Sequence, residues 1–587
     1  MISKGPEGII MMAWLLVLLT LSTSHRLSGA TGSADSKSQA SSDWSRLVDE
    51  FFEQYFKLNP TQATSAGFHQ YDSDLEDYSR RGIDNQIALA HDYLRRLENL
   101  DSSALALEER QDYQLVSNSL KSTLLEQEDI RSWARNPDRY SSGLTQSAFV
   151  IMSRKFAPPE KRLRSLIERE KAMPGVLLAA KENLKNPPRI YTEVAIQQLP
   201  GIVSFFQKDV PEAFRDVHDQ QLQSEFRSSN TAVIRALGDY ETFLKETLLP
   251  RSQGDFRIGA ENYRKKLLYD EMVDIPTDRL LQIGYDDLRR NQQWFKKVAG
   301  QLDPKKTPDQ IRAELQQDHP APDQLLQAFR DDLTGIRQYI VDKQIVTIPS
   351  PVPPIVQETP PFARALTFAS MDTPGPYETV AKEAFFNVTL PEQGWTRAAT
   401  ESFMGQFNRA TMISVAVHEV YPGHYVQFLW VPSAPSKVRK LLGCGSNAEG
   451  WAHYTEQMML DEGYGNGDPR LRLGQLLDAL LRDARYIVGI SMHTGKMTFD
   501  EAVQFFQTEG YQTQSVAEVE TKRGTSDPTY LVYTLGKLEI MKLREDYQEK
   551  MKDNFRLQQF HDTFLRQGFP PVKIVRETML GDDSPTL

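Results

Sequence analysis

The sequence predicts a large, mostly α-helical protein with few strands. Long segments carry apolar residues at i, i+3 and i+4 between charged residues, which is the pattern of helices that bury one face. Prolines follow Asn59 and Asn186 and end two of these segments, because the residue before a proline avoids the α-helical region. With 40% apolar residues, the chain can bury a large core.

The predicted helices are spread along the whole chain. The N-terminal half, 44–344, contains those at 44–58, 85–100, 108–126, 158–183, 231–249, 278–302 and 322–342. The C-terminal half, 345–587, contains those at 448–461, 471–490, 498–507 and 530–551. We expect both halves to form one continuous fold.

A proline-rich segment, 345–377, lies between the halves and could be a flexible linker. However, 362–369 and 384–389 have the composition of short strands. We therefore expect a folded crossing with an edge strand beside the functional site, where an extended peptide could pair with it. Asn387-Val388-Thr389 also matches a glycosylation sequon, but we favour a structural or substrate-binding role for Asn387.

The N-terminus has the features of a targeting signal. Lys4, the apolar run 9–21 and small residues up to Ala30 predict a signal peptide over 1–30. The run is short for a membrane span, and an uncleaved anchor is the alternative. Residues 31–43 are rich in Ser, Ala and Gly and predict a flexible lead-in. We expect an exported protein, in the periplasm or outside the cell, with no stable membrane span after cleavage.

Composition narrows the classes of partner and chemistry. The net charge is −11 and no basic patch stands out, so we expect no nucleic-acid partner. Cys444 is the only cysteine, which excludes an intramolecular disulfide and, because it lies far from the apolar run, argues against a lipid anchor. We expect Cys444 to be a small buried residue rather than a metal ligand or nucleophile. The sequence does not indicate an oligomeric state.

The strongest chemical signal is the segment His418-Glu419-Val420-Tyr421-Pro422-Gly423-His424, with Glu449 downstream. Two imidazoles and a carboxylate can hold a zinc ion and leave a fourth position for water. Glu419, next to the first histidine, could take a proton from that water.

The spacing of the two histidines requires a break in the helix. Residues six positions apart lie about 120° around and about 9 Å along a straight helix, too far apart to share one ion. Pro422 cannot donate to the carbonyl of His418, and Gly423 permits dihedrals closed to other residues. We therefore predict that the helix opens at 421–423 and turns His424 back toward His418.

Several further motifs occur along the chain together with the 418–424 segment. They are Asn59-Pro60-Thr61-Gln62-Ala63-Thr64, Pro360-Pro361-Phe362-Ala363-Arg364-Ala365, Pro374-Gly375-Pro376, Glu449-Gly450-Trp451-Ala452, His493-Thr494-Gly495-Lys496-Met497, Arg523-Gly524 and Tyr533-Thr534-Leu535-Gly536-Lys537. With these motifs the chain resembles the exported branch of the family catalogued as domain of unknown function 885. The resemblance implies a large helical, zincin-like fold with a deep channel and a small β element beside the metal. It also implies peptidase activity on short peptides.

The resemblance assigns roles to particular residues. His418, His424 and Glu449 match metal ligands, and Glu419 matches the general base. Tyr533 matches the position of an oxyanion donor, although it could simply pack on a helix face.

Other assignments concern the substrate and the surroundings of the metal. Arg523 matches a clamp for a substrate carboxylate, or it pairs with Glu520 on one helical face. His493 shares the oxyanion role or caps a turn. Relatives have an acidic residue where this chain has Gly489, so the ligands here need another source of support. We place that support at His453 and Glu456, which follow Glu449 at i+4 and i+7, and we assign Tyr421 to substrate binding.

We therefore expect an exported zinc metallopeptidase of gluzincin type, with Zn²⁺ as cofactor and a short peptide as substrate, acting as a carboxypeptidase or oligopeptidase. One alternative is a zinc hydrolase of another amide or cell-wall bond. A second is a non-catalytic exported peptide-binding protein, against which the intact Glu419 argues. A third is a helical scaffold with structural histidines.

Overall fold

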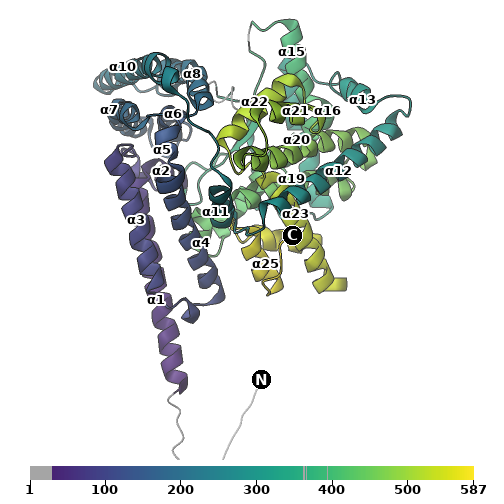
Figure 1. The fold of residues 1–587 in the computed structure, drawn as a ribbon, viewed down its shortest axis with the longest axis horizontal. Helices are drawn as coiled ribbons and strands as arrows, with labels where there is room; N and C mark the ends of the chain where they lie inside the picture. Colours follow the sequence, from purple (N-terminus) through teal and green to yellow (C-terminus); the bar gives the residue numbers. More distant parts are fainter. Residues whose placement is uncertain (1–28, 361–363, 365–366, 393) are drawn as a thin grey trace, which may run out of the picture.

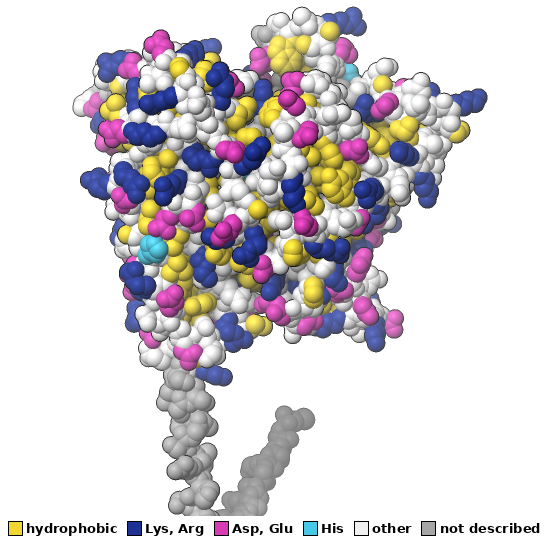
Figure 2. All heavy atoms as spheres, viewed as in Figure 1, with side chains coloured by type: hydrophobic (Ala, Val, Ile, Leu, Met, Phe, Trp, Pro, Cys, Tyr) yellow, Lys and Arg dark blue, Asp and Glu magenta, His cyan; other side chains and the backbone are white. Residues whose placement is uncertain are grey.

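The computed structural model describes residues 29–360, 364, 367–392 and 394–587, with side chains from Lys37 onward. Within this part, the protein is mostly α-helical and contains one three-stranded sheet, which confirms the predicted fold class. On the face shown in Figure 2, acidic and basic side chains are interspersed, and no extended basic patch is visible.

Three long helices form the elongated side of the N-terminal half (Figure 1). They are α1 (Gly29–Leu58), α3 (Arg80–Glu98) and α4 (Leu107–Leu124), and α4 continues as a π-helical turn, η3 (Leu125–Ile130). A second group shares another buried core and consists of α6 (Asp138–Met152), α7 (Pro159–Asn183), α8 (Arg189–Ser204) and α10 (Gln220–Thr242).

The C-terminal half is built around packed helices that carry the candidate site. They are α16 (Arg409–Glu419), α17 (His424–Trp430), α19 (Gly445–Asp461), α20 (Pro469–His493), α22 (Gln514–Ser526) and α23 (Val532–Met551). The α12 helix (Thr277–Leu302) packs along α20, and α11 (Ala260–Glu271) contacts both α4 and α19. The α11 helix therefore lies between the two halves (Figure 1).

Two glycines allow α19 and α23 to cross at very short range. A Cβ atom on Gly450 would lie 2.4 Å from the Cα of Gly536, and one on Gly536 would lie 1.8 Å from the carbonyl oxygen of Ser446. Any larger side chain would separate the helices, since real Cβ atoms do not approach so closely. This crossing brings Glu449 on α19 and Tyr533 on α23 to the walls of the same cavity.

The sheet lies in the crossing between the halves and consists of β1 (Ile355–Glu358), β2 (Ala369–Asp372) and β3 (Phe385–Val388). Its order is β1-β3-β2, with β1 parallel and β2 antiparallel to β3, and Ala369 opposite Val388. The strand predicted at 384–389 is thus confirmed as β3, but it is the central strand. The strand predicted at 362–369 lies partly outside the described residues, and of its described residues only Ala369 belongs to β2. The sequence analysis missed β1 because it follows Pro353-Pro354, although proline is tolerated at the start of an edge strand.

Two contacts fasten this crossing to the N-terminal half. The ring of His69 stacks on Phe156 with centroids 3.9 Å apart, and its nitrogens lie 3.1 Å from Asp72 Oδ1 and 2.9 Å from Glu378 Oε2. Arg154, just after α6, donates from Nη2 to Asp372 Oδ1 at 2.6 Å. Asp372 is the last residue of β2, so the N-terminal half holds one end of this edge strand.

Residues 31–43, for which we predicted a flexible lead-in, belong to α1 in the structure. The segment has no proline and no glycine after Gly32, so the helix predicted at 44–58 extends backward by adding one hydrogen bond per residue. The predicted signal peptide, 1–30, lies almost entirely outside the described residues. None of the helices in the described part combines the length and apolar character needed to cross a bilayer.

The other predicted helices are present. The helices predicted at 85–100, 108–126, 158–183 and 278–302 correspond to α3, α4, α7 and α12, and those predicted at 448–461, 471–490 and 530–551 to α19, α20 and α23. The helix predicted at 498–507 is α21 (Phe499–Thr508), with the capping box of Thr498 and Glu501. The sequence analysis missed α8, which contains Pro200 in its interior, where proline usually ends a helix.

Candidate metal centre

The helix that carries His418 ends where the sequence predicts a break. Asn408 caps the start of α16, its side-chain oxygen accepting from the backbone N–H of Thr411 at 3.1 Å, and the helix ends at Glu419. The Tyr421–Pro422 peptide is cis, and α17 begins at His424. A Cβ atom on Gly423 would lie 1.8 Å from the carbonyl oxygen of His418, so only glycine fits this turn. The predicted opening at 421–423 is thus confirmed, and the two histidine rings come within 4.8 Å of each other.

Glu449 completes a three-residue cluster with these histidines. Its Oε2 lies 3.4 Å from His418 Nε2 and 3.5 Å from His424 Nε2, and one potential ligand atom from each residue lies within 4.8 Å of the others. These separations are longer than ordinary hydrogen bonds. Two atoms bound about 2.0–2.1 Å from a tetrahedral zinc ion lie about 3.4 Å apart. The donor types and their spacing therefore fit a zinc ion.

The electrostatics of the cluster favour positive charge at this point. Burial disfavours the imidazolium form of His418, yet the neighbouring carboxylates of Glu449 and Glu456 raise the pKa of its ring to about 9. Burial also disfavours the carboxylate form of Glu449, but the two imidazoles keep its pKa well below the ordinary value. A cation held between the two imidazoles and Glu449 would complement the charge of this carboxylate.

Glu456 orients the first histidine. Its Oε1 accepts from His418 Nδ1 at 2.7 Å and from Arg482 Nη2 at 3.1 Å, and its Oε2 accepts from His453 Nδ1 at 3.1 Å. With Nδ1 engaged in this way, Nε2 of His418 faces Glu449. Burial opposes ionisation of Glu456, but Arg482 and His453 keep its pKa well below the ordinary value.

Glu456 also supplies the acidic support for a ligand that relatives have at the position of Gly489. A Cβ atom at Gly489 would lie 3.0 Å from the Cβ of Tyr530, so a larger side chain there would require Tyr530 to shift. The sequence analysis did not identify Arg482. An arginine inside an apolar helix was the available signal, because a buried arginine requires an acidic partner.

A cleft of about 680 Å³ opens onto the cluster. His418, Glu419, His424 and Glu449 line it together with residues 367–371, which include most of the edge strand β2. Glu419 is partly exposed, and its side chain makes no hydrogen bond to the described residues. The carboxylate of Glu419 is therefore free to meet a ligand in the cleft.

Tyr533 and Arg523 lie on the opposite helices of the cleft and contact each other. Arg523 Nη2 donates to the Tyr533 hydroxyl at 3.1 Å. The alternative pairing of Arg523 with Glu520 does not form, because Arg485 binds Glu520 through Nε at 2.7 Å and Nη2 at 2.8 Å. Burial raises the pKa of Tyr533, which keeps its hydroxyl protonated at neutral pH.

Three residues assigned to the site lie elsewhere in the described structure. The ring of His493 is buried at the end of α20 and donates from Nε2 to the carbonyl oxygen of Gly524 at 2.8 Å. Tyr421 is 1% exposed and packs in the hydrophobic core beside Tyr425. Both side chains therefore pack inside the protein and do not line the cleft.

Asn387 belongs to the central strand and does not reach the cleft. Its side-chain oxygen accepts from Gln357 Nε2 at 2.9 Å, and it lines a separate cavity of about 310 Å³. Only 5% of Asn387 is exposed, which leaves the sequon inaccessible in the folded protein. Cys444 is buried as expected, and burial raises the pKa of its thiol well above the ordinary value.

The fold and this cluster define a mostly helical protein with a candidate metal centre in its C-terminal half. The family model described as "Bacterial protein of unknown function (DUF885)" matches residues 60–579, and the chain belongs to this family. A comparison with curated proteins found no match.

Two solved structures share the fold. One is titled "The structure of a putative lipoprotein of unknown function from Shewanella oneidensis"; it is 30% identical, with a TM-score of 0.75, and the match covers 92% of this chain and 99% of that one. The other is titled "The crystal structure of the putative lipoprotein from Colwellia psychrerythraea". It is 19% identical, with a TM-score of 0.78, and the match covers 93% of this chain and 99% of that one.

Proposed function

We propose that the protein is a zinc-dependent metallopeptidase that hydrolyses short peptides. The observation that carries this proposal is the cluster of His418, His424 and Glu449, whose spacing suits tetrahedral zinc. Glu419 supports it, because a carboxylate without a partner beside a metal cluster is suited to general-base chemistry.

Each of the cleft residues has a proposed role in peptide-bond hydrolysis. A zinc ion held by the cluster would polarise a carbonyl group and lower the pKa of a water molecule. Glu419 would take a proton from the water and deliver it to the leaving amine nitrogen. The Tyr533 hydroxyl would donate a hydrogen bond to the carbonyl oxygen as negative charge develops there. Arg523 would bind a carboxylate of the substrate.

The edge strand gives the cleft a means of holding a peptide backbone. Within the described residues β2 pairs with β3 alone, so one side of β2 has no strand beside it. An extended peptide could add to this side by main-chain hydrogen bonds, which do not depend on the peptide sequence. This feature favours a peptide over other amide-containing substrates.

We also propose that the protein is exported. The apolar run at 9–21 supports export, and so does the similarity to the Shewanella oneidensis protein, which is described as a putative lipoprotein. The only cysteine here is the buried Cys444, so lipid attachment to a cysteine near the N-terminus has no counterpart in this chain.

The experiment that tests the function combines metal analysis with peptide digestion. Purified wild type and Glu419→Gln are analysed for zinc, then incubated with a mixed peptide library and with cell-wall fragments, and the products are identified by mass spectrometry. Glu545→Gln, an exposed change on α23, is the matched control. We expect stoichiometric zinc in all three proteins and peptide cleavage in all but Glu419→Gln.

Other outcomes have defined meanings. Cleavage of cell-wall fragments alone would move the substrate to another amide bond. Peptide binding without cleavage in wild type would favour a non-catalytic binding protein. Absence of zinc from wild type purified without chelators would refute the metal centre.

A further inference from the structure

A second cavity, of about 710 Å³, lies on the other side of the metal cluster. Glu449, Arg523 and Tyr533 line both this cavity, here called the inner chamber, and the cleft. The remaining walls of the inner chamber come largely from α1, α3, α4 and α11, so the N-terminal half closes it. Glu449, the proposed metal ligand, and Arg523 and Tyr533, the groups proposed to contact the substrate, therefore lie between the cleft and the inner chamber.

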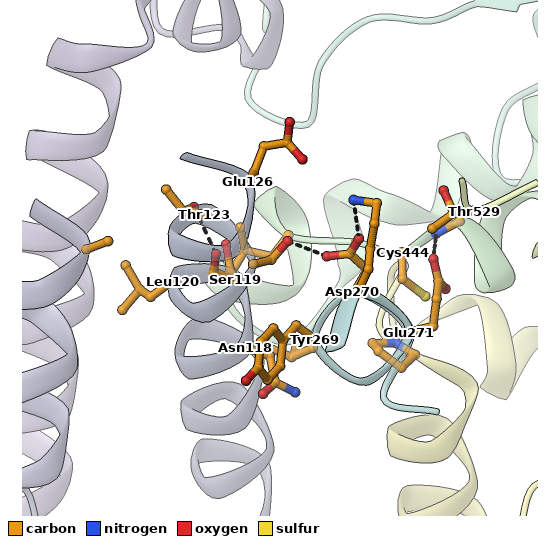
Figure 3. Close-up of a pocket in the computed structure, with 18 of the residues that line it drawn as sticks. Asn118, Ser119, Leu120, Thr123, Glu126, Tyr269, Asp270, Glu271, Cys444 and Thr529 are labelled. Atoms are coloured by element: carbon orange, nitrogen blue, oxygen red, sulfur yellow. Dashed lines mark hydrogen bonds and ion pairs between the residues drawn. The ribbon is translucent and has the colours of Figure 1, made fainter. Parts of the chain in front are cut away.

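One wall of the inner chamber is hydrophilic, although apolar residues such as Phe51, Leu89 and Leu115 also line the chamber. Amide and hydroxyl side chains along its walls include Gln62, Gln86, Asn118, Ser119, Ser122 and Thr123. Carboxylates from η3 and α11 join them, among which Glu126, Asp270 and Glu271 are drawn in Figure 3. The cleft on the other side carries Phe368, Phe403 and Phe428, together with charged residues such as Arg364, Asp478 and Arg485. Both spaces are therefore mixed in polarity.

Part of this polar lining has no partner within the protein. Asp270 is engaged by Lys266 at 2.8 Å, and Glu271 accepts from the backbone N–H of Ser446 at 2.9 Å. The side chains of Asn118, Ser119 and Glu126 form no hydrogen bond or ion pair with the described residues, and Figure 3 shows Glu126 projecting away from its neighbours. All three belong to the continuous helix formed by α4 and η3, so one wall offers donors and acceptors that remain unused.

We propose that the inner chamber is the second half of the substrate site and selects a hydrophilic peptide segment. The substrate would lie across Glu449, with polar residues in the inner chamber, hydrogen-bonded to the α4 wall. A cavity of this size accommodates a small ligand or a few residues of a peptide, not a folded domain. The N-terminal half thus sets both the polarity and the length of the peptide. This proposal rests on the proposed peptidase function.

The test compares peptides that share one cleavable core. The core is extended at either end by three Ser/Asn residues or by three Leu residues, and kcat/KM is measured for each. With wild type, we expect the hydrophilic extension at one end to raise kcat/KM at least tenfold over the core and over the Leu extension. Ser119→Trp, which fills the inner chamber from the α4 wall, should abolish this gain. Gln114→Trp, on the solvent-exposed face of the same helix, should preserve it.

A binding measurement separates this proposal from the peptidase proposal. Zinc-loaded Glu419→Gln binds the same peptides without cleaving them, and calorimetry gives their Kd values in the presence and absence of Ser119→Trp. If no peptide is hydrolysed by wild type but the hydrophilic extension still tightens binding, and Ser119→Trp removes that effect, the inner chamber stands and the peptidase proposal falls.

Two results would overturn the inner-chamber proposal. One is no preference for the hydrophilic extension at either end, in hydrolysis and in binding. The other is a preference that persists in Ser119→Trp. Zinc content and melting temperature verify that Ser119→Trp is folded. If Ser119→Trp is not folded, the same measurements are made on Asn118→Phe, which fills the same space from the neighbouring position.

Discussion

Replacing Glu456 by glutamine should weaken zinc binding by about 10- to 100-fold. The carboxylate of Glu456 accepts from His418, His453 and Arg482 at 2.7–3.1 Å. Glutamine retains the size of the side chain, but its amide nitrogen cannot accept, so at least one of these donors loses its partner. Loss of such an outer partner of a metal-binding histidine typically costs this much affinity, equivalent to about 1.4–2.7 kcal/mol.

The assay is a competition titration of zinc between the protein and a chromogenic chelator. Glu462→Gln is the matched control, because Glu462 lies just after α19 and binds Arg544 at 2.6 Å, away from the cluster. Circular dichroism establishes that each variant is folded before the titration. If Glu456→Gln and Glu462→Gln had the same zinc affinity, the argument that Glu456 orients His418 would be refuted.

Three further predictions concern the cleft, the helix crossing and pH. Tyr533→Phe should lower kcat by about 10²–10³, roughly 3–4 kcal/mol, while zinc affinity is retained; a change in KM alone would contradict the oxyanion role. Gly536→Ala should destabilise the protein by about 1–3 kcal/mol or more, because its Cβ would lie 1.8 Å from a backbone oxygen. The control is Gly238→Ala, whose Cβ would have nothing within 4 Å and which should stabilise the protein by about 0.5–1 kcal/mol. A denaturant titration measures both changes. The pKa of His69 is raised, since hydrogen bonds to its two carboxylate partners outweigh the opposing effect of burial. The stability that it contributes should therefore be fully present below the unfolded-state value of about 6.5 and be lost as the pH rises through the folded-state pKa. Unfolding titrations of wild type and His69→Gln across this range should converge at high pH, and a constant difference would contradict the assignment.

The approach of His424 to His418 was easier to predict from the sequence than the surroundings of these residues, for a physical reason. The proline and glycine at 422 and 423 restrict the backbone locally, so the return of His424 toward His418 could be inferred from nearby residues alone. The interaction of Glu456 with His418 could be anticipated from helical spacing once Glu449 was fixed on α19.

Residues whose surroundings come from distant segments were harder to place. His493 and Tyr421 have side-chain types common in catalytic sites, but their environment depends on tertiary packing that no local pattern reveals. The inner chamber forms between α4 and α11 from the N-terminal half and α19, α22 and α23 from the other, and its lining cannot be read from any one segment. The order of the sheet was equally hidden, because β1 and β3 pair across a separation of thirty residues.

The ion pair between Arg154 and Asp372 has a mechanical consequence. It fixes the end of β2 to the N-terminal half, while the middle of the same strand forms a wall of the cleft in the C-terminal half. A change in the angle between the halves would therefore displace this strand. A tilt of the N-terminal helices would thus move the strand that we propose to align a peptide, relative to the helices that carry His418, His424 and Glu449.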